Sequence, residues 1–206
     1  MRRFLRTRAT PRTLVAAWWL AVAWYVLLTM ICILFVDRPV ASWVGHGADF
    51  WNGVVSVVEY ATGIEPWIWL VPVILCVLVL WTFQSPLGAQ FRRGVLFVAL
   101  DYLLARNLMM WGKLAFGRLR PHQWIAGESF WRHGESFPSG HVVLVAGLIV
   151  PLVVVAPRLR PLLALVLLVA IARVFAGAHW VGDVMGGFAC VALSTAICVP
   201  LLRRRR

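Results

Sequence analysis

The sequence predicts an all-α membrane protein, with six transmembrane helices in one bundle and both chain termini in the cytoplasm. Of its 206 residues, 62% are hydrophobic and only 14% are charged, and the mean hydropathy is +0.84. Six long apolar runs follow one another along the chain, separated by short segments that hold clusters of arginine. This composition excludes a water-soluble globular protein, and the repeated runs indicate a polytopic one.

The first apolar run covers residues 13–36 and is followed by Asp37, Arg38 and Pro39. It is longer than the core of a signal peptide, and no small-residue cleavage site comes after it. A helix that spans the bilayer needs roughly 20 apolar residues, so we expect this run to be a retained transmembrane helix. The mixed stretch at residues 40–65 then predicts a loop with a short interfacial helix.

Five further runs predict the remaining helices. Residues 66–83 carry no charge and have tryptophan near both ends, which is typical of membrane interfaces. Residues 94–112 are apolar except for Asp101 and Arg106, and charges within a span usually face the interior of a bundle. The last three runs cover residues 142–156, 161–178 and 184–202.

The basic residues predict the orientation of the bundle. With both termini inside, thirteen of the twenty lysines and arginines lie on the cytoplasmic side, and none of the eight acidic residues does. This is the positive-inside pattern, and it requires an even number of spans. The thirteen are Arg2, Arg3, Arg6, Arg8, Arg12, Arg92, Arg93, Arg158, Arg160, Arg203, Arg204, Arg205 and Arg206.

The placement of charges and cysteines excludes several kinds of partner. The net charge of +12 could suggest nucleic acid, but the arginines flank the apolar runs instead of sharing one polar surface. All four cysteines fall within apolar runs, so neither a disulfide framework nor a zinc site is indicated. We therefore expect one membrane domain over residues 1–206 that contacts membrane lipids and uses no cofactor.

One outer loop departs from the charge pattern. The loop between the third and fourth spans, with its borders, holds Lys113, Arg118, Arg120 and Arg132. Topology disfavours positive charge on this side, so a functional reason is indicated. We expect Lys113 and Arg120 to belong to a site, and Arg118 and Arg132 to meet lipid headgroups or solvent. All five histidines also lie in the outer segments: His46, His122, His133, His141 and His179.

Three short motifs gather at this outer face. In chain order they are Lys113-(six residues)-Arg120-Pro121, Pro138-Ser139-Gly140-His141, and Arg173-(five residues)-His179-(three residues)-Asp183. Phosphoryl transfer needs mainly positioning and cations around the phosphate oxygens, which Lys113, Arg120 and Arg173 supply from three segments. Ser139 and Gly140 precede a predicted helix, and the free N–H groups at a helix start bind anions.

Two histidines complete the chemistry that these motifs can perform. His179 would attack phosphorus, and Asp183, four residues later on the same helical face, would hold its other ring nitrogen. His141 would protonate the leaving oxygen and then activate water. Capping of the fourth and sixth spans is a simpler role for Ser139 and Asp183, and it does not exclude catalysis.

The order and spacing of the three motifs resemble those of the phosphatidic acid phosphatase type 2 (PAP2) superfamily, whose pattern is K-x6-RP, PSGH and SR-x5-H-x3-D. The match is complete except that Ala172 stands where the family has serine. The motif region, residues 113–183, is about a third of the chain, and the six-helix layout extends the resemblance. The resemblance implies a phosphohistidine intermediate, no metal, and a phosphate site of three basic residues with Ser139.

These observations favour a metal-independent phosphatase that hydrolyses a phosphomonoester or pyrophosphate of a lipid at the outer face of the membrane. The resemblance admits polyprenyl pyrophosphate, phosphatidylglycerol phosphate, phosphatidate and phosphorylated lipid A as substrates. A compact chain without eukaryotic signals favours a bacterial plasma membrane, with the site facing the periplasm or the exterior.

Other functions fit the sequence less well. A phosphotransferase of the same fold would pass the phosphate to a second lipid, and the sequence does not distinguish it from a hydrolase. An intramembrane serine protease using Ser139 and His179 would have no need of the three basic residues. A channel or transporter lacks paired Gly/Pro-broken helices in corresponding halves. Haem ligation by His141 and His179 would place the cofactor at the headgroups instead of in a buried site.

Overall fold

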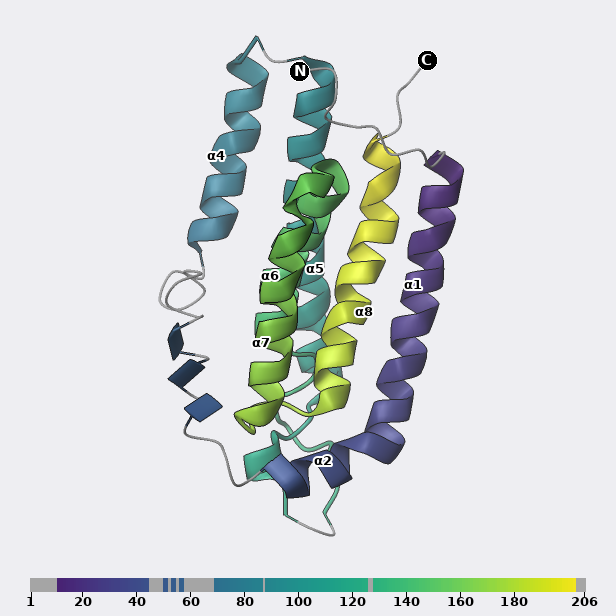
Figure 1. Cartoon of the computed structure of the whole chain (residues 1–206), viewed down its shortest axis with the longest axis vertical. Helices are drawn as coiled ribbons and strands as arrows, with labels where there is room; N and C mark the ends of the chain where they lie inside the picture. Colours follow the sequence, from purple (N-terminus) through teal and green to yellow (C-terminus); the bar gives the residue numbers. More distant parts are fainter. Residues whose placement is uncertain are drawn as a thin grey trace.

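The computed structural model describes residues 11–44, 50–51, 53–54, 56–57, 69–86, 88–125 and 128–202. In this part of the chain the structure is all-α, and six helices pack side by side along one axis (Figure 1). They are α1 (Pro11–Ile31), α4 (Leu70–Gln84), α5 (Ala89–Phe116), α6 (Gly140–Val155), α7 (Leu163–Phe175) and α8 (Val181–Cys198). The predicted all-α class and the six helices are confirmed.

The six helices differ in whether they can cross a membrane. Three stretches of the described residues are long and apolar enough to do so: Thr13–Val44, Ala89–Phe116 and Val181–Leu202. The helices α4 and α6 are apolar but shorter. The helix α7 has only 13 residues, and at about 1.5 Å per residue it is shorter than the hydrocarbon core. Length and composition therefore support three to five spans, fewer than the six predicted.

Helix α8 lies in the middle of the bundle and packs against α1, α5, α6 and α7. Small residues on α8 allow this close packing, as is usual between membrane helices. A Cβ atom added at Gly187, for example, would lie 3.2 Å from Cγ1 of Val142 on α6. Large apolar side chains on the outside, such as Trp24 of α1 and Leu80 of α4, are exposed, which suits a surface that faces lipid.

The sequence predicts that the first helix ends before Asp37, but the structure continues it past this residue. A π-helical segment, η1 (Cys32–Val36), continues α1, and α2 (Asp37–Val44) follows it directly. Pro39 lies in α2 and has no N–H group to donate, and a proline and a π-helical segment within a helical run both produce kinks. Figure 1 shows α2 turned across the end of the bundle, next to the ends of α7 and α8. Of the loop predicted at residues 40–65, the first five residues are helical and most of the rest lies outside the described residues.

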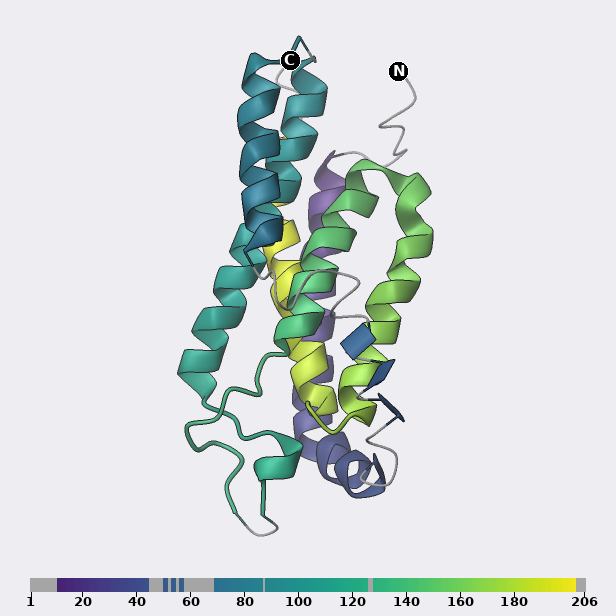
Figure 2. The ribbon, with the colours of Figure 1, turned by 90° about the vertical axis from the view of Figure 1, so that its left-hand side faces the viewer.

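The two ends of the bundle carry different groups of residues. One end holds the start of α5, with Arg92 and Arg93, and the connection η3 (Pro157–Leu162), with Arg158 and Arg160. The opposite end holds α2, the loop between α5 and α6, and the turn between α7 and α8 (Figure 2). All three motifs lie at this second end, so these four arginines, all predicted to be cytoplasmic, and the motifs are separated by the length of the bundle.

The two charged residues in the middle of α5, Asp101 and Arg106, each have a partner on another segment. Asp101 is fully buried and accepts a hydrogen bond from the hydroxyl of Ser194 on α8. The guanidinium carbon of Arg106 lies 4.2 Å from the ring centre of Trp69, a cation–π contact. Both residues therefore connect α5 to its neighbours within the apolar part of the bundle.

Candidate active site

The first motif lies where α5 ends. Gly117 closes the helix in the left-handed conformation, with φ of 56°, and its N–H group donates to the carbonyl of Lys113 at 3.1 Å. The ammonium group of Lys113 donates to the backbone carbonyl of Glu135. Arg120 follows three residues after Gly117, and its N–H group donates to Oε1 of Gln123 at 3.1 Å. The motif thus has its lysine on a helix end and its arginine on a loop.

The loop after α5 folds back on itself and returns the chain to the start of α6. The N–H group of Leu119 donates to the carbonyl of Phe130 at 2.7 Å, and that of Ser136 donates to the carbonyl of Arg118 at 2.8 Å. A Cβ atom added at Gly134 would overlap the backbone of Arg118. The outgoing and returning segments of the loop therefore approach closely only because this residue is glycine. The doubled loop brings Ser136 beside the second and third motifs.

The second motif begins α6. Ser139 is fully buried at the N-cap position, and its N–H group donates to the carbonyl of Asp183 at 2.9 Å. Its hydroxyl does not cap the helix, contrary to the simpler role considered above, and it has no hydrogen-bond partner among the described residues. A Cβ atom added at Gly140 would lie 3.1 Å from Sδ of Met109 and 3.8 Å from Cε of Lys113. The start of α6 therefore packs directly against the end of α5.

The third motif spans the tight turn between α7 and α8. Arg173 is buried in the last turn of α7, and its carbonyl accepts from the N–H groups of Ala178 and His179 at 3.2 and 3.1 Å. Gly177 has φ of 65°, a conformation that favours glycine, and it lets the chain reverse within a few residues. This turn brings the histidine back toward the arginine that precedes it.

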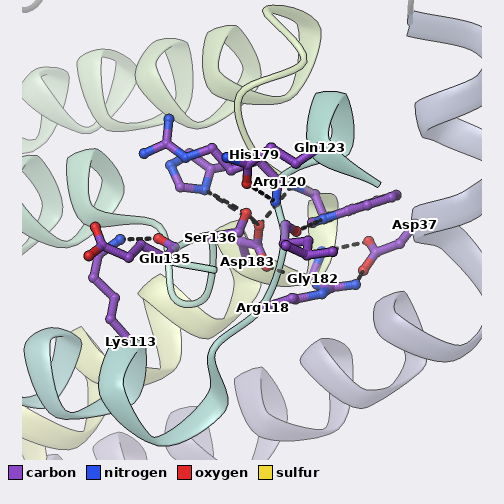
Figure 3. A network of polar contacts seen from close by, with 12 residues as sticks. Asp37, Lys113, Arg118, Arg120, Gln123, Glu135, Ser136, His179, Gly182 and Asp183 are labelled. Carbon is purple, nitrogen blue, oxygen red and sulfur yellow. Dashed lines mark hydrogen bonds and ion pairs between the residues drawn. The ribbon is translucent and has the colours of Figure 1, made fainter. Parts of the chain in front are cut away.

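His179 and Asp183 meet at the start of α8. His179 is only 2% exposed, and its Nδ1 atom lies 3.4 Å from Oδ2 of Asp183 (Figure 3). The same carboxylate oxygen accepts from the N–H group of Trp180 at 2.9 Å and from the hydroxyl of Ser136. Asp183 therefore caps α8, as its position suggested, and also faces the histidine. With Nδ1 turned to the carboxylate, Nε2 is the nitrogen available for a ligand.

The surroundings of His179 favour the neutral form of its ring. Burial of the ring lowers its pKa below the ordinary value, and the carboxylate of Asp183 acts in the opposite direction. The positive charges of Arg173 and Lys113 lower the pKa further. His141, at the second position of α6, lies within reach of the same charges, since Arg173, Arg120, Lys113 and His179 all act on it.

A cavity of about 660 Å³ opens beside these residues. Arg120, Arg173 and His179 line it together with Val40 and Val44 of α2. The remaining lining residues are Asp37, Ala41, Pro121, His122, Val174, Ala176, Gly177, Ala178, Trp180 and Val181. The lining thus combines cationic and apolar side chains, and Lys113, Ser139, Gly140, His141 and Asp183 are not among the lining residues.

Sequence reasoning missed the contribution of α2 and misplaced one arginine. Arg118, expected to meet headgroups or solvent, is instead fully buried, with ion pairs to Asp37 at 2.6 Å and to Asp183 at 2.8 Å. The expectation holds for Arg132, which is exposed and pairs with Glu128 on the surface at 3.2 Å. The two arginines look alike in the sequence because both are basic residues in one polar loop. The signal in the sequence that could have indicated a buried partner for Arg118 is Asp37, an acidic residue at the end of an apolar run.

The comparison with known families agrees with this geometry. A model described as the PAP2 superfamily matches residues 94–206, which is more than half of the chain. The chain belongs to the PAP2 superfamily. No curated protein matches it. The family serine replaced by Ala172 would lie in a fully buried part of α7, so its loss from this PAP2 protein leaves no polar group there to satisfy.

One solved structure also shares the fold of this PAP2 protein. It is the crystal structure of the transmembrane PAP2-type phosphatidylglycerolphosphate phosphatase from Bacillus subtilis. The two chains are 22% identical, the TM-score is 0.56, and the similarity covers 91% of this chain and 93% of the other. Because the similarity covers 91% of this chain, the shared fold of this multi-pass membrane protein extends well beyond the family region.

Proposed function

We propose that this protein is a phosphatase that hydrolyses a phosphomonoester or pyrophosphate of a membrane lipid. The supporting observation is a cavity lined by a buried, carboxylate-held histidine, two arginines and apolar side chains of α2. The arginines suit a phosphate group and the apolar side chains suit a lipid chain. We place all 206 residues in one PAP2 domain, since the single bundle leaves no second unit in the described residues.

The first half of the proposed reaction forms a phosphohistidine. Nε2 of His179 attacks the terminal phosphorus while its bond to the leaving oxygen breaks. In a phosphomonoester this oxygen belongs to the lipid alcohol, and in a pyrophosphate it is the bridging oxygen, which departs with the lipid phosphate. His141, in its protonated form, gives a proton to the departing oxygen. Lys113, Arg120 and Arg173, together with the hydroxyl of Ser139 and the N–H group of Gly140, stabilise the charge on the phosphate oxygens.

The second half returns the enzyme to its starting state. His141, now neutral, takes a proton from water as the water oxygen attacks phosphorus and the bond to His179 breaks. Inorganic phosphate leaves, and His141 is protonated again. Throughout, Asp183 offsets the positive charge that develops on the ring of His179.

The apolar residues that line the cavity bear on the class of substrate. Val40, Ala41 and Val44 occupy positions that put them on one face of α2, and all three line the cavity. An acyl or prenyl chain lying along this face would place its phosphate near Arg120 and Arg173. Phosphatidylglycerol phosphate, phosphatidate, polyprenyl pyrophosphate and phosphorylated lipid A all have this form.

Activity is expected to survive removal of metal ions. Among the described residues no group of three or more His, Cys, Asp and Glu side chains could hold a metal, and lysine and arginine supply the positive charge. The measurement is phosphate release by purified protein from the four lipids above, with and without EDTA. Loss of activity in EDTA, with rescue by magnesium or zinc, would contradict the metal-free reaction.

The cavity is expected to face away from the cytoplasm of a bacterial plasma membrane, with all six helices crossing the bilayer. This orientation places the arginines at the start of α5 and in η3 inside. Two exposed residues at opposite ends of the bundle, Ser129 and Ala89, allow a test with cysteine substitutions. The background is a variant in which the four native cysteines are replaced by serine or alanine.

The cysteine at Ser129 should react with a membrane-impermeant thiol reagent in intact cells. The cysteine at Ala89 should react only after the membrane has been opened. The reverse labelling pattern would show that the orientation is wrong, whatever the substrate.

A further inference from the structure

A buried chain of charges lies behind His179. The guanidinium group of Arg118 bridges two carboxylates, with Nη2 at 2.6 Å from Oδ2 of Asp37 and Nη1 at 2.8 Å from Oδ1 of Asp183 (Figure 3). The side chains of all three residues are fully buried. Asp183 in turn faces Nδ1 of His179. Asp37 is therefore connected to the proposed nucleophile through two intervening side chains.

The start of α8 is shaped to accept this arrangement. The N–H group of Gly182 donates to Oδ1 of Asp37 at 2.8 Å. A Cβ atom added at Gly182 would lie 2.7 Å from Oδ2 of Asp37 and 3.3 Å from Nη1 of Arg118, so no larger residue fits without moving the pair. Asp37 comes from α2, outside the region that the family model matches, and it is reached only because η1 and α2 bend over the site.

Several charged groups act on His179, so the net charge of Asp37, Arg118 and Asp183 behind it is important. They include the positive groups Arg173 of α7 and Lys113 of α5, and His179 in turn acts on the titratable His141 of α6. Arg120 lines the same cavity as His179, and Asp183 of α8 is the negative group that faces the ring. When the ring of His179 becomes positive on forming a bond to phosphorus, Asp183 is the group that stabilises it.

Arg118 alone would weaken this stabilisation. A guanidinium paired with Asp183 cancels much of its charge at the histidine, and the effect is large where water is excluded. With Asp37 present, the three residues together carry a single negative charge. We infer that Asp37 is a positioning residue that neutralises Arg118, so that Arg118 holds Asp183 in place while Asp183 keeps its negative charge for His179.

This inference rests on the proposed function, and it predicts a specific change in pH dependence. In Asp37→Asn the negative charge near His179 is reduced, so protonation of the ring is disfavoured. The acid limb of kcat/KM, which reports this protonation in the free enzyme, should move to lower pH. The value of kcat should fall on the order of tenfold. This is the effect of losing charge stabilisation equivalent to about one pKa unit. KM should change little, because the residues around the phosphate are untouched.

Two further variants separate charge from shape. Arg118→Gln removes the cation and leaves both carboxylates, so its acid limb should move to higher pH. The double variant Asp37→Asn/Arg118→Gln restores a single negative charge, and its acid limb should return close to that of the wild type. Asp37→Glu keeps the charge with altered geometry, so its acid limb should stay near the wild-type position even if kcat falls.

Surface residues of the same loop provide the matched control. Glu128→Gln and Arg132→Gln break an exposed acid–arginine pair and should leave kcat and the acid limb unchanged. All variants are assayed as full-length protein in detergent, with the lipid from the panel above that the wild type hydrolyses fastest. Thermal unfolding of each variant shows whether it is folded.

The possible results have distinct meanings. If the wild type releases no phosphate from any lipid in the panel, the proposed function fails. If the wild type is active and folded Asp37→Asn keeps the wild-type acid limb, the role of Asp37 is overturned and the proposed function stands. If Asp37→Asn does not fold, the comparison passes to Arg118→Gln and the double variant. If the acid limb of kcat/KM lies at the same pH in those two variants, the inference is likewise overturned. If it lies at higher pH in Arg118→Gln than in the double variant, the inference is supported.

Discussion

Replacing His179 with alanine is expected to abolish phosphate release while lipid binding persists. The alanine variant has no nitrogen to attack phosphorus, and loss of a covalent nucleophile typically lowers kcat by on the order of 10⁴- to 10⁶-fold. Arg120 and Arg173, which line the cavity beside this position, are unchanged and continue to attract the phosphate. Purified protein should therefore retain binding of a labelled lipid phosphate in a pull-down or fluorescence assay.

His133 offers a matched control for this variant. It lies in the same loop system but is exposed, and its φ of 50° is in the left-handed region, so asparagine is the suitable replacement. His133→Asn should keep the wild-type rate. A His179→Ala protein that is folded and hydrolyses lipid at near wild-type rate would show that another group is the nucleophile.

Exchanging the two cavity arginines for lysine should cause the second large loss. Arg173 is 7% exposed and Arg120 is partly buried, so both present their guanidinium groups from confined positions. Lysine keeps the charge but replaces a planar group that can donate two parallel hydrogen bonds to phosphate with a single point charge. Each change is expected to lower kcat/KM roughly 100-fold, as for loss of one donor to a developing anion.

Arg132 is the matched control for the arginine variants. It is an exposed arginine of the same loop, paired with Glu128 on the surface, and Arg132→Lys should have little effect on kcat/KM. Losses of similar size at all three positions would mean that the phosphate site extends onto the outer surface of the loop.

The helices and the motifs could be predicted from the sequence for a simple physical reason. A bilayer demands long apolar runs, and the chain has six of them, so helix number and chain order follow from composition. The spacing from His179 to Asp183 is also a local property, since four residues on a helix bring two side chains to one face. The structure places these two side chains 3.4 Å apart.

The lengths of individual spans were less well predicted. The apolar run at residues 161–178 includes a 3₁₀ segment at its start and a tight turn at its end, so α7 itself is only 13 residues long. The run that ends near Asp37 instead continues through η1 into α2. In both cases hydrophobicity marks where the chain is apolar, but the backbone conformation within the run depends on what it packs against.

The sequence by itself determined the all-α class, the number of helices and the resemblance to the PAP2 superfamily, because apolar runs and motif spacing are properties of neighbouring residues. The partners of Arg118 were decided by the tertiary structure alone. Arg118 and Asp37 are 81 residues apart, and Arg118 and Asp183 are 65 residues apart, so no local pattern joins them. They meet because α2 bends over the start of α8, where the missing side chain of Gly182 leaves room for a buried ion pair.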